Sequence, residues 1–366
     1  MFGAQWQHSS SGVDRGFMAV PFKVYAEDPH WLGERSHDLQ KSFSEANTYF
    51  QQGEAWLGCL GETRLAGFFE KGFELDKEPV AYFGFWETNN NLEANRSLFS
   101  ELEKWAKSKG ARALYGPINF STFGNYRLRV DSFHEPAFMG EPYNPSYYPD
   151  LLEKLQFEVC QRYQSRFHPD AGVWAEQVAP EQKKLSIQLQ SQFSMQSITP
   201  DLWLGYLPQI HRLVEAAFSK NFGYRSIPAR DFERIYGESY IAASCPVTSQ
   251  IVLDSIGELA GFFVCFPDYA ELINGRIQRN QICRFEYATH FSKLTRPRTL
   301  LAKTGAVNPK YRNQRIFTWM CNQLIISSVD DYQSICAALM RDDNHSMNYG
   351  SKFPNSRHYA LFKKRI

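Results

Sequence analysis

Two basic residues, Arg312 and Arg315, lie where a strand-like segment gives way to a helix-like one. Within 299–324 the chain is apolar and β-prone through Val307, turns through a short polar loop, and then resumes with apolar residues at helical spacing: Ile316, Phe317, Met320 and Leu324. The start of a helix offers unpaired N–H groups and the positive end of a dipole to an anion. We therefore interpret this segment as a candidate site for a ligand that carries phosphate.

Glu286 and His290 are candidates for moving a proton. A carboxylate and an imidazole four residues apart could together deprotonate an ammonium group. The same spacing is equally typical of an ordinary pair on the exposed face of a helix. Both interpretations stay open at this stage.

The bulk composition limits the classes of function. The 40 basic and 39 acidic residues nearly cancel, so no general field attracts DNA or an anionic membrane. The seven cysteines are scattered and contain no C-x-x-C pair, which argues against a disulfide framework and a zinc site. We expect no metal. There is no apolar run of about 20 residues and no signal-peptide pattern, so we expect a cytoplasmic protein.

The elements that would position these residues form an α/β (α+β) pattern. At 366 residues, two domains are expected, with a boundary in the polar crossing near 170–185 that gives domains 1–175 and 176–366. The first half predicts a helix over 36–52, a hairpin over 56–69, a strand over 80–86 and a helix from about 92 to 109. The second half predicts helices over 200–218 and 229–244, a hairpin over 249–266, and strands over 299–307, 334–340 and about 358–364.

Both halves share a short motif. Leu-Ala-Gly-Phe-Phe occurs at 65–69 and at 259–263, and in each half a strand, a helix and a further strand follow it. Each half also places an Asn near the end of this pattern, at Asn144 and Asn344. A duplicated supersecondary unit is the simplest account.

These segments resemble the GCN5-related N-acetyltransferase (GNAT) superfamily. In the second half the resemblance rests on the hairpin, on the segment LLAKTGAVNPKYRNQRI and on the strand and Asn-containing loop CAALMRDDNHSMNYGS. In the first half, FGFWETNN, YGPINFST and MGEPYNPSYYPDLLEKLQFE resemble the same tandem bacterial group of largely unknown function. The resemblance implies two tandem GNAT-like domains, each a mixed, mainly antiparallel sheet flanked by helices.

The resemblance implies acyl transfer from a thioester, usually acetyl-CoA. By the same resemblance, backbone N–H groups near Ala306 and Val307 would hold the thioester carbonyl. The donor's pyrophosphate would lie against the following loop, which comprises Arg312, Asn313, Gln314, Arg315 and Ile316. Asn344 would contact the pantetheine arm, although an Asn here also suits a loop cap.

The resemblance also suggests roles at the acceptor side. Tyr349 is the candidate general acid for the leaving thiolate, although a Tyr is more often a packed aromatic. Glu286 is the candidate base. Asn221, Tyr224 and Arg225 occupy the loop that would shape the pocket for a small-molecule amine.

The phosphate loop departs from the superfamily pattern, Gln/Arg-x-x-Gly-x-Gly/Ala. Arg315 and Phe317 fill the two glycine positions. In one interpretation, the Arg315 guanidinium replaces the contacts that the backbone N–H groups of the loop would make with phosphate. In the other, coenzyme A binding at this loop has weakened or been lost. The first half has no glycine in the equivalent loop and only Arg96, so we interpret that half as a scaffold.

Three functions remain open. The first is an acyltransferase from acyl-CoA to a small-molecule amine, and the second is a transferase that uses acyl carrier protein or aminoacyl-tRNA as donor. The third is a non-catalytic binding protein. The near-neutral charge weighs against tRNA.

Overall fold

The computed structural model describes residues 4–5, 12–273, 284–344, 347 and 355–366. Over this part of the chain it forms two compact units. The first unit contains the chain up to residue 163 and also residues 357–366; the second contains residues 164–272 and 284–356, as far as they are described. The sequence predicts one boundary near 175, whereas the chain leaves the first unit within β7 (Glu158–His168) and returns to it at the C-terminal strand β13 (Asn355–Arg365).

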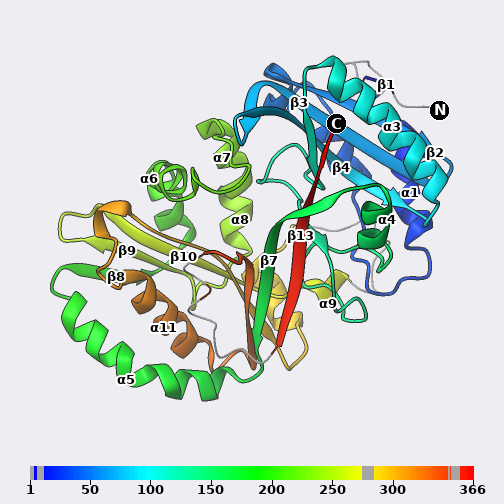
Figure 1. The fold of residues 1–366 in the computed structure, drawn as a ribbon. Coiled ribbons are helices and arrows are strands. Elements are labelled where there is room, and N and C mark those ends of the chain that lie inside the picture. The colour runs from blue at the N-terminus through cyan, green and yellow to red at the C-terminus, as the bar shows by residue number, and fades with distance from the viewer. Residues whose placement is uncertain (1–3, 6–11, 274–283, 345–346, 348–354) are drawn as a thin grey trace. The chain divides into compact units, whose positions relative to one another are not determined.

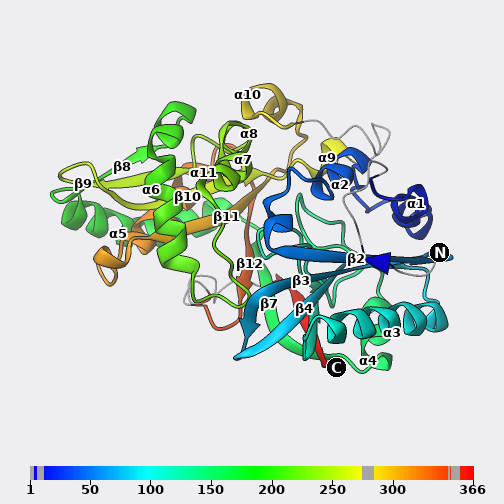
Figure 2. The ribbon, with the colours of Figure 1, turned by 90° about the horizontal axis from the view of Figure 1, so that it is seen from above.

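The first unit is a sheet covered on both faces. Its strands follow the order β1-β2-β3-β4-β5-β13, with β4 and β5 parallel and the remaining neighbours antiparallel. Helix α3 covers one face, and α1 and α2 cover the other (Figure 2). The elements are β1 (Ala4–Gln5), α1 (Arg15–Val24), α2 (Ser36–Ser42), β2 (Gly53–Leu60), β3 (Thr63–Leu75), β4 (Glu78–Thr88), α3 (Leu92–Ser108), β5 (Ala113–Gly116), β6 (Leu128–Arg129) and α4 (Tyr148–Lys154).

The helix predicted over 36–52 is shorter than expected. Helix α2 ends at Ser42, and a single 3₁₀ turn occupies Thr48–Gln51. The side chain of Asn47 explains the break, because its amide donates to the Ser42 carbonyl at 2.8 Å and its oxygen accepts from the Tyr49 N–H at 3.1 Å. An Asn that bonds the backbone on both sides competes with helix continuation.

The second unit has the same type of sheet. The strand order is β12-β11-β10-β9-β8, with β11 and β12 parallel and the others antiparallel. Helix α11 lies against α5 (Figure 1). The elements are α5 (Ala171–Leu189), β8 (Phe193–Ser197), α6 (Pro200–Phe218), α7 (Ala229–Tyr236), α8 (Glu238–Ala242), β9 (Gln250–Asp254), β10 (Leu259–Pro267), α9 (Ala270–Ile273), α10 (Tyr287–His290), β11 (Thr299–Val307), α11 (Ile316–Ser328) and β12 (Ser334–Arg341).

The segment interpreted as a polar crossing is the helix α5. Asp170 starts it, since its carboxylate accepts from the Val173 N–H at 2.9 Å. Pro180 lies inside the helix, which is the reason its sequence suggested a break. Leu185 and Leu189 are buried in the core cluster that also contains α11, so tertiary packing outweighs the local signal.

The repeated hairpin has the same register in both units. Gly67 of β3 lies opposite Phe83 of β4, and Gly261 of β10 lies opposite Val307 of β11. In each unit the next helix, α3 or α11, begins nine residues after that pair. The structure therefore places Phe83 and Val307 at equivalent points before equivalent helices, as duplication predicts.

Candidate functional site

The parallel strands β11 and β12 separate before they end. They pair only from Thr299 opposite Ser334 to Ala302 opposite Ala337. β11 continues for five residues to Val307, still paired with β10, and β12 continues to Arg341. The second unit therefore has two parallel strands that diverge over their last residues.

The loop that follows β11 approaches α11 in an unusual conformation. Asn313 and Arg315 have φ values of +67° and +62°, in the left-handed region that glycine prefers. Arg315 is also the N-cap of α11, and its side chain makes no capping hydrogen bond. This residue thus keeps the backbone conformation of a glycine while carrying a guanidinium.

Arg315 is held by an acidic residue of a neighbouring helix. It forms an ion pair with Glu181 of α5, and Glu181 also accepts from the Asn322 amide at 3.1 Å. The Asn322 hydrogen bond, and after it the Arg315 guanidinium, lower the pKa of the Glu181 carboxyl. The Arg315 and Glu181 side chains are 50% and 44% exposed, so the pair is weak and a phosphate could displace the carboxylate.

Phe317, in the second glycine position, belongs to the core. Its ring lies 5.8 Å from that of Phe263 of β10, and it packs against the core cluster of the second unit. The adjacent Phe262 packs instead on Trp203 of α6. Because successive strand residues point to opposite faces, α11 and α6 cover opposite faces of this sheet.

The structure brings most of the predicted donor residues to one edge of the sheet. Ala306 and Val307 end β11, Ile316 begins α11, and the residues between them that were assigned to the donor are exposed: Arg312, Asn313, Gln314 and Arg315. Asn344 is exposed in the turn after β12, where its N–H donates to the Arg341 carbonyl at 2.9 Å. Because β11 and β12 are parallel, Asn344 and the 312–316 loop leave the sheet at the same edge.

The structure describes the candidate base but not the candidate acid. Tyr349 lies outside the described residues. Glu286 is exposed at the N-cap of α10, and its carboxylate accepts from the Thr289 hydroxyl at 3.2 Å. Its contact with His290 runs through its own backbone N–H, 3.1 Å from Nδ1, and the two side chains form no ion pair.

The candidate acceptor loop is anchored to α6. The Tyr224 hydroxyl donates to Glu215 at 2.7 Å, and burial and then this carboxylate raise the pKa of the Tyr224 hydroxyl. Asn221 donates its N–H to the Phe218 carbonyl at 2.8 Å and is exposed, while Arg225 is half-buried in the same loop. The structure thus groups these three residues between α6 and α7.

The equivalent place in the first unit is closed. There β4 and β5 pair through Tyr82 opposite Tyr115, immediately before Phe83. The Ile118 N–H then donates to the Phe83 carbonyl at 2.7 Å, and the Phe85 N–H donates to the Asn119 side chain at 2.8 Å. These hydrogen bonds occupy the backbone groups that a ligand would need. The strands β4 and β5, which are equivalent to β11 and β12, therefore stay joined at this point.

Sequence reasoning missed a buried polar cluster around Glu87, near the end of β4. The hydroxyls of Tyr25 and Tyr148 donate to the same carboxylate oxygen at 2.8 and 2.7 Å. Burial raises the pKa of Glu87 to about 7, although Arg64 and the two hydroxyls lower it. The partners stand about 60 residues away on either side, so no local spacing could have revealed the cluster.

Several kinds of site are absent from the described ranges. No group of three or more His, Cys, Asp or Glu is placed to hold a metal ion there. Among the helices of the described residues, none is long and apolar enough to cross a membrane. The six described cysteines are free.

The architecture defines a fold. Two units, each with a hairpin, a parallel strand pair and a helix after its first parallel strand, form a tandem GNAT fold, and solved structures agree. A tandem GNAT protein from the clavulanic acid biosynthesis pathway aligns over 99% of this chain and 98% of its own, with a TM-score of 0.51 and 10% identity. The GCN5-related glucosamine N-acetyltransferase region of a fungal multi-domain GH3 β-N-acetylglucosaminidase aligns over 99% of this chain and 38% of its own, with a TM-score of 0.52 and 8% identity.

One curated protein is similar to this chain in amino-acid sequence. Protein YghO of Escherichia coli (strain K12) is 20% identical over 229 residues, which are 60% of this chain and 57% of YghO. The match therefore spans little more than half of that protein. No family model matches the chain.

Proposed function

We propose that the second unit binds an acyl thioester, such as an acyl-CoA, between β11 and β12 and transfers the acyl group to an amine of a small molecule. The observation that carries this proposal is the early divergence of the parallel strands after Ala302 and Ala337. The first unit has the same fold and register but no such divergence. The first unit then serves as a scaffold for this reaction.

The residues at this edge suit the charges of such a donor. Backbone N–H groups of β11 near Ala306 and Val307 would donate to the thioester carbonyl oxygen as negative charge develops on it. The N-terminus of α11, with Arg312 and Arg315, would lie against the diphosphate. Asn344 would hydrogen-bond the pantetheine arm.

The reaction itself requires two proton movements. The acceptor ammonium loses a proton, for which Glu286 is the proposed base, and its nitrogen then attacks the thioester carbon. The C–S bond breaks, and the thiolate receives a proton from Tyr349 as the proposed acid. Asn221, Tyr224 and Arg225 would contact the acceptor.

Binding tests the proposal first. Melting temperatures measured with acetyl-CoA, longer acyl-CoAs and free coenzyme A should rise, since a ligand at 100 times its Kd adds about 2.7 kcal/mol of stability. Arg315→Ala should abolish the shift, whereas Arg230→Ala, an exposed cation at the start of α7, should keep it. No shift with any of these ligands would refute the coenzyme A form of the proposal.

A second donor chemistry is favoured by one observation, the loss of both loop glycines to Arg315 and Phe317. An acyl carrier protein presents its thioester on a pantetheine arm with a single phosphate and needs no adenosine diphosphate contact. Acyl transfer from an acyl carrier protein, without any shift by coenzyme A, would support this alternative. Binding of either donor without turnover of any amine would indicate a non-catalytic protein.

A further inference from the structure

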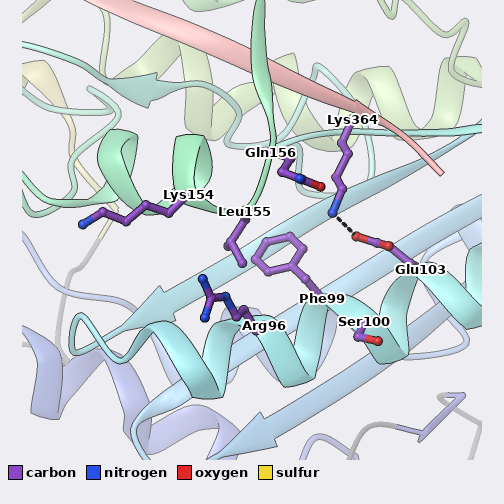
Figure 3. Close-up of a pocket in the computed structure, with 8 residues that line it drawn as sticks. All are labelled: Arg96, Phe99, Ser100, Glu103, Lys154, Leu155, Gln156 and Lys364. Carbon is purple, nitrogen blue, oxygen red and sulfur yellow. Dashed lines mark hydrogen bonds and ion pairs between the residues drawn. The ribbon is translucent and has the colours of Figure 1, made fainter.

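The first unit contains a pocket of about 300 Å³ beside helix α3 (Figure 3). Helix α3, the end of α4 and the strand β13 form its walls. Its polar lining residues are Arg96, Ser100, Glu103, Lys154, Gln156 and Lys364. Phe99 and Leu155, which are 1% and 5% exposed, provide an apolar floor.

The charges of this lining do not cancel. Lys364 and Glu103 form an ion pair of 2.7 Å, and each side chain is only 19% exposed, so this pair is internally compensated. Figure 3 shows it at one end of the pocket. Arg96 and Lys154 remain, and the lining therefore carries two positive charges beyond its own carboxylate.

Neither remaining cation is strongly held. Arg96 pairs with Glu93 at 2.7 Å, but the two side chains are 54% and 80% exposed, so water already competes for this contact. Lys154 is exposed and forms no ion pair with the described residues. In Figure 3 the Arg96 guanidinium points toward Leu155, and the Lys154 side chain extends away from the other labelled residues.

The backbone at Gln156 ends helix α4. Its φ of +67° is the left-handed conformation that commonly follows a helix, and the Phe157 N–H donates to the Leu152 carbonyl at 2.9 Å. In Figure 3 the Gln156 side-chain amide lies beside Lys364, at the same end of the pocket as the ion pair between Lys364 and Glu103.

We propose that this pocket binds a small phosphomonoester. The dianion would match the two positive charges that the carboxylate of the lining does not compensate. The Arg96 fork can hold two phosphate oxygens at once when it exchanges Glu93 for the ligand. Ser100 and Gln156 supply neutral donors, and the apolar body of the ligand would rest on Phe99 and Leu155. This site lies in the first unit and does not depend on the donor site proposed for the second.

Calorimetric titration with inorganic phosphate, glycerol 3-phosphate and phenyl phosphate tests the proposal at constant ionic strength, with succinate as a dianion that lacks phosphate. We expect saturable binding of the phosphate compounds, tightest for phenyl phosphate because of the apolar floor. Arg96→Gln combined with Lys154→Gln should weaken it at least tenfold. Lys104→Gln combined with Lys107→Gln removes the same charge from the exposed side of α3 and should change it less than twofold.

The remaining outcomes overturn the proposal. These are a lack of saturation, equal binding of succinate, or an equal loss in both double variants, which would indicate general electrostatic attraction. Lys154→Gln alone, at an exposed position, provides a folded variant if the double substitution unfolds the unit, and it should still weaken binding. Titrations repeated in an Arg315→Ala background remove the proposed diphosphate contact of the second unit. Binding that persists there and falls with Arg96→Gln and Lys154→Gln belongs to this pocket, whereas loss of all phosphate binding in that background would overturn the proposal.

Discussion

Glu87 should make the first unit less stable as the pH rises toward neutrality. Its folded pKa is raised to about 7 from an ordinary value of 4.5. Below pH 4.5 the carboxyl is protonated in the folded and unfolded chains alike, so its raised pKa does not change the free energy of unfolding. Between the two values the unfolded chain releases its proton while the folded chain keeps it, so the free energy of unfolding falls with rising pH.

The size of this effect follows from the shift. One pKa unit corresponds to about 1.4 kcal/mol, so the folded unit loses about 3 kcal/mol between pH 4.5 and pH 7 from this group. Glu87→Gln cannot ionise and should remove that loss. A glutamine can still meet the hydroxyls of Tyr25 and Tyr148, because each hydroxyl both donates and accepts.

Two measurements check this reasoning. Selective ¹³C labelling of glutamate carboxyls, with Glu87→Gln for assignment, should give a titration midpoint near pH 7. Hydrogen exchange of the β4 amides in urea, at pH 5 and pH 8, should show a smaller drop in stability for Glu87→Gln than for the unmodified chain. The exposed carboxylate of Glu101 provides the control, since Glu101→Gln should behave as the unmodified chain does. A midpoint below pH 5 would refute the assignment of a partly buried, proton-retaining carboxyl.

Three further substitutions have definite expected results. Glu181→Gln should tighten acyl-CoA binding up to about fivefold in titrations, because it removes an exposed ion pair, worth about 1 kcal/mol, that competes with the donor for Arg315. An unchanged affinity would show that Arg315 does not bind the donor. Gly84→Ala should destabilise the first unit by about 1 to 3 kcal/mol in urea unfolding, because the new Cβ would lie 2.5 Å from the Ile118 carbonyl oxygen. Gly205→Ala, inside α6 with open space around it, should instead raise the unfolding free energy by about 0.5 to 1 kcal/mol, and a loss of stability there would contradict the helix assignment.

The sequence predicts the parts of this fold that depend on local pattern. Helix α3 begins and ends as its pattern indicates, because Asn91 caps it and Leu98 and Leu102 recur at helical spacing on its buried face. The hairpins follow from alternating apolar residues around short turns. Most of α5, from Ala171 to about Leu185, was missed because Pro180 suggests a break that packing overrides.

The features that depend on distant partners could not be predicted in this way. The pairing of β13 with β5 joins residues about 250 positions apart, and the Glu87 cluster joins three separate segments. The divergence of β11 and β12 is likewise a matter of where pairing stops, which the apolar pattern of either strand does not encode. The sequence nevertheless locates the loop that is proposed to bind the donor, because Arg312 to Ile316 stand directly between a strand and a helix.

The position of β13 has a consequence for the order in which the protein forms during synthesis. Residues 357–366 complete the first unit by pairing with β5, yet they leave the ribosome after the whole sequence of the second unit. The first unit must therefore wait with one sheet edge unpaired while the second unit is made, and such an edge is open to association with other chains. Deleting the last ten residues should accordingly harm the part of the molecule encoded first.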